Sequence, residues 1–397
     1  MNWAKFSGSL ASVNRRLCFL CVVLSLNLAD FAKSFTPNYQ PSRTEKKKMP
    51  NILMNKLGLR TPIVQAPMAG ASNADFVVAA CQAGALGSLG AGMMSPDAIA
   101  DEIAKIKAQT KQAFAVNLMV LDDEQTSKLA GEMPEWLAKK YAELGITPTL
   151  DEKPAHDFKA QFAAVLDNPA PVVSFTFGII DKNAVQALKD KGCIIIGTAN
   201  YVDEVLAWQA VGADAVVVQG AQAGGHQGGW LHEADEKLDT LTLVEQAKAA
   251  SDIPLIAAGG IATAEQVAAA LAAGADLVAV GTAFLTTHES VISTAWQERL
   301  LAASGADTQF TRLFSGKVAR GITNDFLREF AQFDGLSSHS EVRSYPTQNA
   351  MTKALRAYAG KAADSELMSL WAGTAVAHCQ RESIAHLVAR LCADLPA

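Results

Sequence analysis

The stretch Ala215-Val216-Val217-Val218-Gln219-Gly220-Ala221-Gln222-Ala223-Gly224-Gly225-His226 joins a short apolar run to a glycine pair and a histidine. The β-branched residues predict a buried strand. Glycines let backbone approach a ligand, and parallel-strand barrels collect their chemistry at the carboxyl ends of strands. We therefore predict that Gly224 and His226 lie in a functional pocket.

Seven similar apolar runs surround this one along the chain. The eight predicted strands are Pro62–Ala66, Gly84–Leu89, Ala113–Leu118, Val172–Phe177, Cys193–Thr198, Ala215–Gln219, Pro254–Ala258 and Leu277–Gly281. The helices predicted between them are Asn73–Gln82, Pro96–Ala108, Lys182–Lys191, Val202–Val211, Leu241–Ala250 and Ala264–Ala273. Strands that alternate with helices are typical of a parallel sheet, and eight such units close a barrel of about 250 residues. The sequence thus predicts an α/β fold, the (β/α)8 TIM barrel.

Two segments exceed a plain barrel. We assign residues 49–290 to the barrel, with a helical insertion at about 122–167 that three prolines divide into short pieces. Residues 291–397 are too long for a final barrel helix and too apolar to be disordered. We expect them to form a helical C-terminal extension that packs on the barrel and its mouth.

Residues 1–48 differ from the rest of the chain. Basic residues precede an apolar run at 17–28 that resembles a secretory signal and is too short to span a bilayer. Cleavage after Ala29 or Ala32 would place Asn27 or Asp30 where a small residue is required. We therefore favour Met49 as the initiator, an N-terminal extension outside the fold and a cytoplasmic location, with secretion as the alternative.

The composition narrows the class of protein. Half of the 397 residues are hydrophobic and the net charge is −6, which indicates a globular protein with a large core. No face rich in Lys and Arg favours nucleic acid, and no stable membrane association is expected. Cys18-x-x-Cys21 lacks a second ligand pair, so no metal is predicted. The alanine-rich exterior is compatible with a homodimer.

Two glycine turns predict a phosphate site. Gly259-Gly260 ends the seventh strand, and Ala279-Val280-Gly281-Thr282 ends the eighth. The loops after strands seven and eight are the usual phosphate site of this barrel, and free N–H groups at a helix start favour an anion. The chain has neither the glycine fingerprint of dinucleotide-binding units nor a triphosphate loop at these turns, so a mononucleotide fits better.

These motifs together resemble the class I nitronate monooxygenases, formerly called 2-nitropropane dioxygenases. The resemblance runs in order from about Met54 into the extension. The segments that carry it are Gln65-Ala66-Pro67-Met68-Ala69-Gly70, Val116-Asn117-Leu118, Gln219 through His226, Ala258-Gly259-Gly260-Ile261, Gly281-Thr282, Gly316-Lys317-Val318-Ala319-Arg320-Gly321, Tyr345-Pro346-Thr347-Gln348-Asn349 and Trp371-Ala372-Gly373.

The resemblance implies non-covalent FMN in the barrel. Its phosphate would lie at Gly259, Gly260 and the 279–282 turn, and its ring system against Ala66, Pro67 and Met68. Asn117, Gln219 and Gly224 are implied as further flavin contacts. Amide side chains both donate and accept, which suits the mixed polar edge of a flavin.

The implied activity is the oxidative denitrification of alkyl nitronates, such as propionate 3-nitronate, and of nitroalkanes, a detoxification. Oxygen is consumed, and a carbonyl compound and nitrite are formed. His226 matches the catalytic histidine of the family. Nitroalkanes are carbon acids, so a histidine that titrates near neutrality can remove the α-proton, or orient a nitronate that is already formed.

Three residues are weaker candidates for substrate contacts. Ser88 follows the second strand, and Tyr345 and Lys353 would share one face of a helix opened by Pro346. Gln222 departs from the family, in which glutamate is frequent, and this change could alter the pKa of the base.

Other functions share these motifs. An FMN-dependent NAD(P)H reductase, acting on enoyl-ACP or on a quinone, is the main alternative, because fold does not fix function. A flavin-binding protein without turnover is a further alternative, although such a protein has no need of His226.

Overall fold

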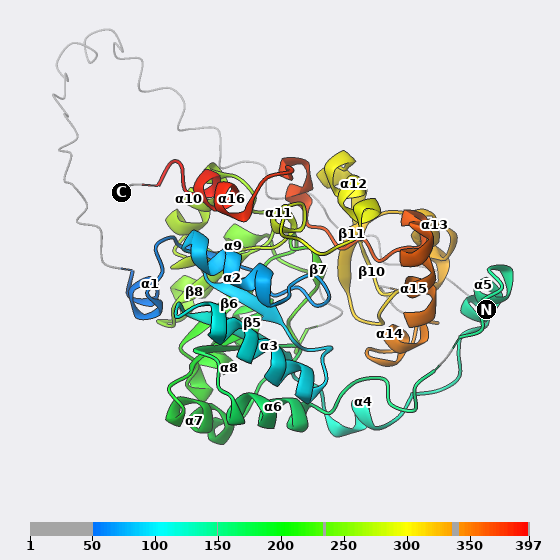
Figure 1. Cartoon of the computed structure of the whole chain (residues 1–397), viewed down its shortest axis with the longest axis horizontal. Helices are drawn as coiled ribbons and strands as arrows, with labels where there is room; N and C mark the ends of the chain where they lie inside the picture. The colour runs from blue at the N-terminus through cyan, green and yellow to red at the C-terminus, as the bar shows by residue number, and fades with distance from the viewer. Residues whose placement is uncertain (1–50, 149, 233–235, 336–340, 396–397) are drawn as a thin grey trace, which may run out of the picture. The chain divides into compact units, whose positions relative to one another are not determined.

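The computed structural model describes residues 51–148, 150–232, 236–335 and 341–395 (Figure 1). Its centre is an eight-stranded parallel sheet of β1 (Ile63–Gln65), β2 (Gly87–Gly90), β3 (Phe114–Met119), β4 (Val172–Thr176), β5 (Ile194–Ala199), β6 (Ala215–Gln219), β8 (Leu255–Ala258) and β9 (Leu277–Val280). All eight predicted strands are present, with ends shifted by a few residues. The predictions for residues 1–48 and for Met49 lie outside the described residues.

The sheet closes into a barrel. Its strand order is β1-β9-β8-β6-β5-β4-β3-β2, so each strand pairs with the neighbour expected from βα units. Between the two ends of that order, Leu86 N donates to Ile63 O at 2.9 Å and Gln65 N donates to Leu86 O at 2.9 Å. The TIM-barrel prediction is confirmed.

Helices surround the barrel. They are α2 (Ala74–Ala83), α3 (Pro96–Gln109), α6 (Phe158–Asp167), α7 (Lys182–Asp190), α8 (Val202–Val211), α9 (Thr240–Ala250), α10 (Ala264–Ala272) and α16 (Ile384–Leu391). Side-chain caps define several starts: Ser95, Asp181 and Thr263 accept from backbone N–H groups of the first turn. Their apolar faces pack on the outer side chains of the strands in one continuous core.

The amino-terminal end of the barrel is plugged by α1 (Ile52–Leu57). Leu53 and Leu57 pack against inward-facing side chains such as Val64, Ile196 and Ile256. This packing leaves the opposite end of the barrel, where the strands have their carboxyl ends, to hold a ligand.

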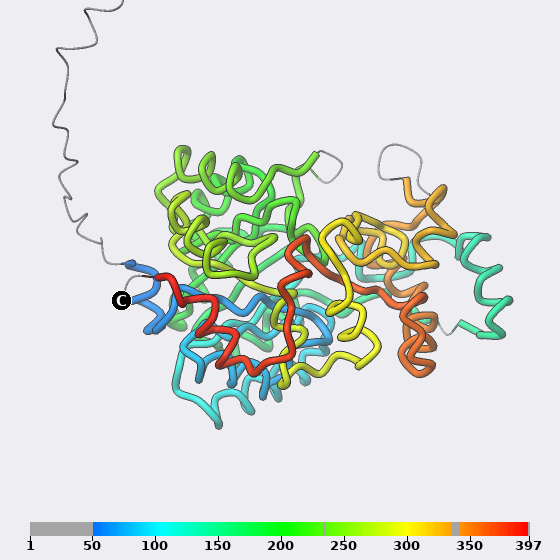
Figure 2. The backbone as a smooth tube through the Cα atoms, turned by 90° about the horizontal axis from the view of Figure 1, so that it is seen from above, coloured from blue at the N-terminus to red at the C-terminus, as the bar shows by residue number. Residues whose placement is uncertain are grey.

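The final helix corrects the expected domain boundary. α16 packs against α2 and α10, with Leu387 and Leu391 in the main barrel core, so it is the helix of the eighth βα unit (Figures 1 and 2). The predicted division into 49–290 and 291–397 separates this helix from its strand. The extension is therefore inserted between β9 and α16 rather than appended.

The inserted unit contains both helices and strands. Its elements are α11 (Thr282–Leu285), α12 (Thr294–Ala302), η2 (Gly305–Asp307), β10 (Thr308–Thr311), β11 (Ala319–Ile322), α13 (Asp325–Glu329), η3 (Ala331–Phe333), α14 (Thr347–Met351), α15 (Lys353–Ala362), η4 (Ser365–Leu367) and η5 (Thr374–His378). The expected helical extension thus omitted a three-stranded antiparallel sheet of order β10-β11-β7, in which β7 (Gly225–His226) comes from the barrel. This sheet fastens the inserted unit to the loop that follows β6.

The segment between β3 and β4 contributes helices both to the barrel and to a second hydrophobic core. It contains α4 (Asp123–Ser127), α5 (Glu135–Glu143) and α6, and α6 packs on α3 as a barrel helix. By contrast, α5 lies beside the inserted unit (Figure 2). The two share a second core, in which the Trp136 ring lies 4.9 Å from that of Phe330.

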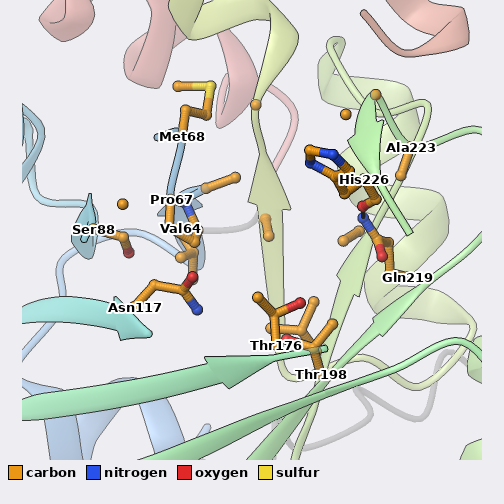
Figure 3. Close-up of a pocket in the computed structure, with 18 of the residues that line it drawn as sticks. Val64, Pro67, Met68, Ser88, Asn117, Thr176, Thr198, Gln219, Ala223 and His226 are labelled. Carbon is orange, nitrogen blue, oxygen red and sulfur yellow. Dashed lines mark hydrogen bonds between the residues drawn. The ribbon is translucent and has the colours of Figure 1, made fainter. Parts of the chain in front are cut away.

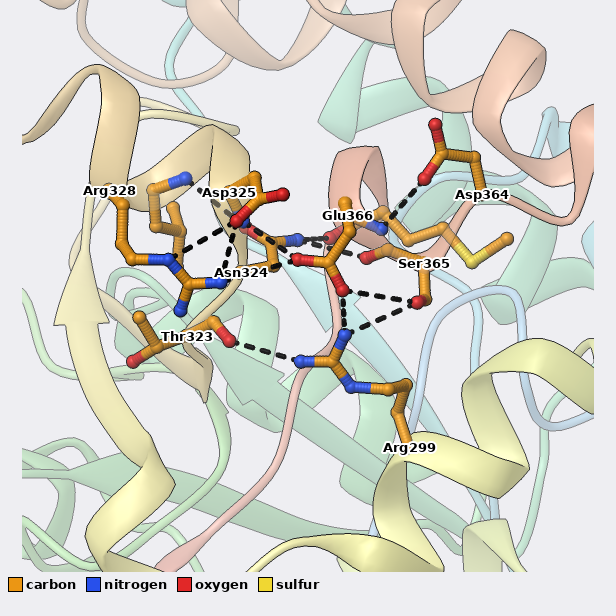
Figure 4. Close-up of polar contacts among 10 residues, drawn as sticks. Arg299, Thr323, Asn324, Asp325, Arg328, Asp364, Ser365 and Glu366 are labelled. Carbon is orange, nitrogen blue, oxygen red and sulfur yellow. Dashed lines mark hydrogen bonds and ion pairs between the residues drawn. The ribbon is translucent and has the colours of Figure 1, made fainter.

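A polar cluster joins three parts of the inserted unit (Figure 4). Glu366 of η4 pairs with Arg299 of α12 and accepts from the backbone N of Asp325 at the start of α13. Asn324 donates to Met368 O at 2.8 Å from a fully buried position. These bonds connect η4 to α12 and α13, and the Asn324 bond satisfies a buried amide, so the short helices have a fixed arrangement. In the described part of the chain, no helix is long and apolar enough to cross a bilayer.

Candidate active site

A cavity opens at the carboxyl end of the barrel (Figure 3). Side chains two residues apart along each strand point into it, as the period of a strand requires. Its lining includes Val64, Ala66, Pro67, Met68, Ser88, Asn117, Ser174, Thr176, Phe177, Thr198, Gln219, Gly224, Gly225, His226, Gly259, Gly260, Ala279, Gly281, Thr282, Trp296 and Trp371. All eight strands therefore contribute to one site.

The first wall is the end of β1. Ala66, Pro67 and Met68 line the cavity, and Ala66 N donates to Val280 O at 2.9 Å, which fixes this segment against β9. At Gly281 an added Cβ would lie 3.6 Å from Ala66 Cβ, within ordinary contact distance. The predicted residues at the ends of β1 and β9 are thus brought together.

The two glycine turns offer free donors. Gly259 and Gly260 have φ values of +120° and +68°, a region that favours glycine. Among the described residues, the backbone N–H groups of Gly259, Gly260 and Ile261 have no hydrogen-bond partner, and neither have those of Gly281 and Thr282. Converging unpaired N–H groups in a cavity suit an anionic ligand.

Polar side chains lie on the opposite part of the lining. Asn117 is buried, and its Nδ2 donates to Ser174 Oγ at 3.0 Å. Ser88 also lines the cavity, and its backbone N donates to Gln65 Oε1 at 2.8 Å. Both are therefore held in place by neighbours within the barrel, as a preorganised site requires.

Gln219 makes more contacts with the protein than the sequence indicates. Its Nε2 donates to His226 O at 3.0 Å, and its Oε1 accepts from Gly228 N at 2.7 Å. This side chain therefore bridges β6 to the segment that carries His226. Asn200 adds to the same network, because its Nδ2 donates to Gln219 O at 2.7 Å.

The requirement for glycine at 224 also has a second cause. An added Cβ would overlap the backbone N of Gly373 and the carbonyl carbon of Ala372. The close approach is thus to another part of the chain, while Gly224 still lines the cavity. Gln222 is likewise structural: its Oε1 accepts from Thr240 N at the start of α9.

His226 lies on β7, opposite Ala319 of β11. Its ring faces Pro67 and Met68 across the cavity (Figure 3). Its Nε2 lies 2.8 Å from Ser315 Oγ. The other ring nitrogen, Nδ1, has no hydrogen-bond partner among the described residues.

Aromatic rings enclose this histidine. The His226 centroid lies 5.4 Å from those of Phe177 and Trp371 and 5.7 Å from that of Tyr345. Burial by these rings, with added repulsion from Lys317 and Arg356, lowers the pKa of His226 from 6.5 to about 3. The imidazole is therefore neutral near neutral pH, and it binds a proton less readily than the histidine titrating near neutrality that the sequence predicts.

The two weaker candidates in the extension, Tyr345 and Lys353, lie in different environments. Tyr345 is buried beside His226, its hydroxyl lies 3.1 Å from Met119 Sδ, and burial raises its pKa to about 12. Lys353 is exposed instead, and its Nζ pairs with Asp151 at 2.8 Å. It is not among the residues that line the cavity. The interruption between α14 and α15 ends the common helix face on which Lys353 was expected.

Sequence reasoning missed several residues around His226. Ser315, Arg356 and the Asn200–Glu204 pair come from parts of the chain that only the tertiary structure brings near. Ser315 directly precedes the Gly316-Lys317 motif, which was the one local signal available. In the described ranges, no group of His, Cys, Asp or Glu could hold a metal ion.

Comparisons with known proteins agree with this site. A family model described as nitronate monooxygenase matches residues 51–394. A "probable nitronate monooxygenase" of Staphylococcus aureus is 36% identical over 327 residues, which is 81% of this chain and 91% of that protein. The nitroalkane oxidase of Streptomyces ansochromogenes is 36% identical with a TM-score of 0.76, covering 86% of this chain and 97% of the other. FabK of Thermotoga maritima, at 24% identity and a TM-score of 0.67 over 85% of this chain and 94% of its own, shares the fold.

Proposed function

Because this chain belongs to the nitronate monooxygenase family, an oxidoreductase family, we propose that it uses FMN and O2 to convert alkyl nitronates and nitroalkanes into a carbonyl compound and nitrite. Propionate 3-nitronate is a representative substrate. The observation that carries the proposal is the position of His226, whose ring faces the Pro67-Met68 wall across one cavity (Figure 3).

The cavity fits FMN in its chemistry. The unpaired N–H groups of Gly259, Gly260 and Ile261 would hold the phosphate, together with those of Gly281 and Thr282. The ring system would lie between the end of β1 and the segment 224–226, with Asn117 at its polar edge. When bound, FMN supplies the redox chemistry, and the protein supplies binding, orientation and proton transfer.

His226 acts on the proton of the substrate. Its neutral imidazole would accept the α-proton of a nitroalkane, whose C–H electrons move onto the nitro group to give the nitronate. With a substrate that is already a nitronate, the same ring would orient the anion. Lys317 and Arg356 add positive charge around the site, which favours the nitronate anion, whether it is formed there or binds as the substrate.

The surrounding rings exclude water. Phe177, Tyr345 and Trp371 close around His226, and Phe177 has a φ of +72°, an uncommon backbone for a bulky residue. Its backbone N donates to Gly228 O at 2.8 Å, so contacts with the His226 loop hold this conformation. A strained residue maintained beside a reactive group is typical of functional sites.

The test is anaerobic mixing of the FMN-loaded protein with propionate 3-nitronate and, separately, with NADH and NADPH, followed by flavin absorbance. We expect the nitronate to change the flavin spectrum, admission of air to release nitrite, and neither nicotinamide to bleach the flavin. Bleaching by NADH or NADPH without a response to nitronate would move the assignment to a reductase.

A matched variant separates catalysis from binding. His226→Asn should retain FMN and lose turnover of nitroalkanes, because the base is removed while the glycine turns are intact. Nitrite release at the wild-type rate from this variant would contradict the assigned role of His226.

A further inference from the structure

The side chains of β4 alternate between the cavity and the outer core of the barrel. Ser174 and Thr176 line the cavity (Figure 3). Phe175, between them, is fully buried on the outside of the strand, where its ring centroid lies 6.1 Å from that of Trp208 on α8. The period of a strand would therefore direct the next side chain, Phe177, outward as well.

Phe177 departs from this alternation. Its φ is +72°, and it lines the cavity with its ring centroid 5.4 Å from that of His226. The other described residue besides glycine with a positive φ, Ala363, ends the helix α15, where such backbone is common. For a bulky residue at the end of a strand this backbone is unfavourable. Its effect here is to turn the phenyl ring from the outer core toward His226.

The loop that carries His226 holds the backbone of Phe177 in place. Phe177 N donates to Gly228 O at 2.8 Å, and Thr176 Oγ1 donates to the same oxygen at 3.3 Å. A Cβ added at Gly228 would lie 2.6 Å from Thr176 Oγ1, so the close approach requires glycine. Strained backbone persists where surrounding contacts determine it in this way.

The ring of Phe177 is also fixed by its neighbours. It meets the rings of His226 and Tyr345 edge to face, with centroid separations of 5.4 and 5.3 Å. Lys317 Nζ lies 4.9 Å from its centroid. Aromatic rings at these separations are in contact, so no carbon chain fits between Phe177 and His226. The phenyl ring is therefore a rigid wall of the cavity beside the base.

We propose that Phe177 is a specificity-determining residue that limits the length of the carbon chain on the nitronate. The inference rests on the proposed function, in which the carbon that bears the nitro group reaches His226. A chain that extends from this carbon toward the end of β4 meets the phenyl ring, whereas a short chain does not reach it. The preferred substrates are therefore short alkyl nitronates, and loss of the ring admits longer ones.

Two substitutions remove the ring and differ in their backbone. Phe177→Gly accepts a φ of +72° without strain, whereas Phe177→Ala keeps the unfavourable conformation. We expect the midpoint of urea unfolding to be higher for Phe177→Gly than for Phe177→Ala. The opposite order would overturn the proposal, because without the left-handed backbone the side chain at this position follows the strand outward.

The substrate test compares kcat/KM for the nitronates of nitroethane and nitrohexane in the FMN-loaded wild type and Phe177→Gly. Nitronates are used because they need no proton abstraction, so a change in the pKa of His226 does not enter the comparison. Phe177→Gly should raise the hexyl to ethyl ratio of kcat/KM about ten-fold or more, since one methylene group in an apolar pocket already changes such a ratio by roughly this factor. An unchanged ratio would overturn the proposal.

Phe175→Leu is the matched control. Phe175 is the same residue type on the same strand, but its ring faces the outer core. This variant should unfold at a lower urea concentration than the wild type and leave the hexyl to ethyl ratio unchanged. A shift of the ratio equal to that of Phe177→Gly would mean that the ratio reports a general loosening of the barrel, and would overturn the proposal.

Calorimetric titration separates this proposal from the proposed function. Propionate and heptanoate are unreactive, planar oxyanions that differ in chain length, and they are titrated into the FMN-loaded proteins. We expect Phe177→Gly to gain about ten-fold in affinity for heptanoate relative to propionate. No gain for heptanoate would overturn the proposal, even where nitronates are turned over. Failure of the wild type to turn over any nitronate would refute the proposed function, while the titrations still decide whether Phe177 limits chain length.

Discussion

The burial of His226 predicts a specific pH dependence of stability. The pKa is about 3 in the folded protein, against about 6.5 for an ordinary histidine. As pH falls through 6.5, the unfolded chain gains a proton that the folded ring does not accept. The contribution of the neutral His226 to the free energy of unfolding is therefore fully present above pH 6.5 and is lost progressively as the pH falls below this value.

The size of the effect follows from the two pKa values. Each unit of difference corresponds to about 1.4 kcal/mol, so between pH 7 and pH 5 the folded protein loses about 2 kcal/mol through His226 alone. His226→Asn cannot titrate in this range and lacks this loss. Other groups titrate equally in both proteins and cancel in the comparison.

The assay is urea unfolding at pH 7 and pH 5, at equal flavin occupancy. Wild type should lose about 2 kcal/mol more than His226→Asn between the two pH values. Tyr345→Phe is the matched control, because it changes a ring packed against His226 without removing a group that titrates between pH 5 and pH 7, and it should behave as wild type. Equal losses in wild type and His226→Asn would refute the reasoning and mean that the cavity accepts an imidazolium readily.

Further variants test other parts of the site. Gly224→Ala should abolish most turnover and destabilise the protein by about 1–3 kcal/mol, since its Cβ overlaps backbone at Gly373; nitrite assays and urea unfolding check this. Lys353→Ala should leave KM for propionate 3-nitronate within about two-fold, because its exposed partner is Asp151 and such pairs contribute little. Glu204→Gln should cost about 1–3 kcal/mol in unfolding, because a fully buried carboxylate that accepts several backbone N–H groups becomes an amide with one acceptor oxygen.

The local pattern of residue types along the sequence was sufficient to predict the barrel fold. Runs such as Ala215–Gln219 are short, rich in β-branched residues and followed by glycine. This local pattern predicts a buried parallel strand even when the neighbouring strands are not known. Eight of them separated by helices leave few topologies, because such crossovers are nearly always right-handed. The same reasoning placed Gly259, Gly281 and His226 at the carboxyl ends of strands, where one cavity now contains them.

The inserted unit did not follow from local pattern. β10 and β11 are four residues each. β10 pairs with β11, and β11 pairs with β7 across about ninety positions of sequence, so the sheet depends on a partner that no local window contains. The return of α16 to the barrel is also a long-range event, because an amphipathic helix buries its apolar face wherever a matching groove exists.

The barrel, the resemblance to the family and the residue types at the strand ends follow from local sequence. The surroundings of His226 do not: its ring is buried by Phe177, Tyr345 and Trp371, and its Nε2 is bonded to Ser315. These contacts arise only on folding, because the pKa and the hydrogen-bond partners of a side chain depend on groups that come together from distant parts of the chain.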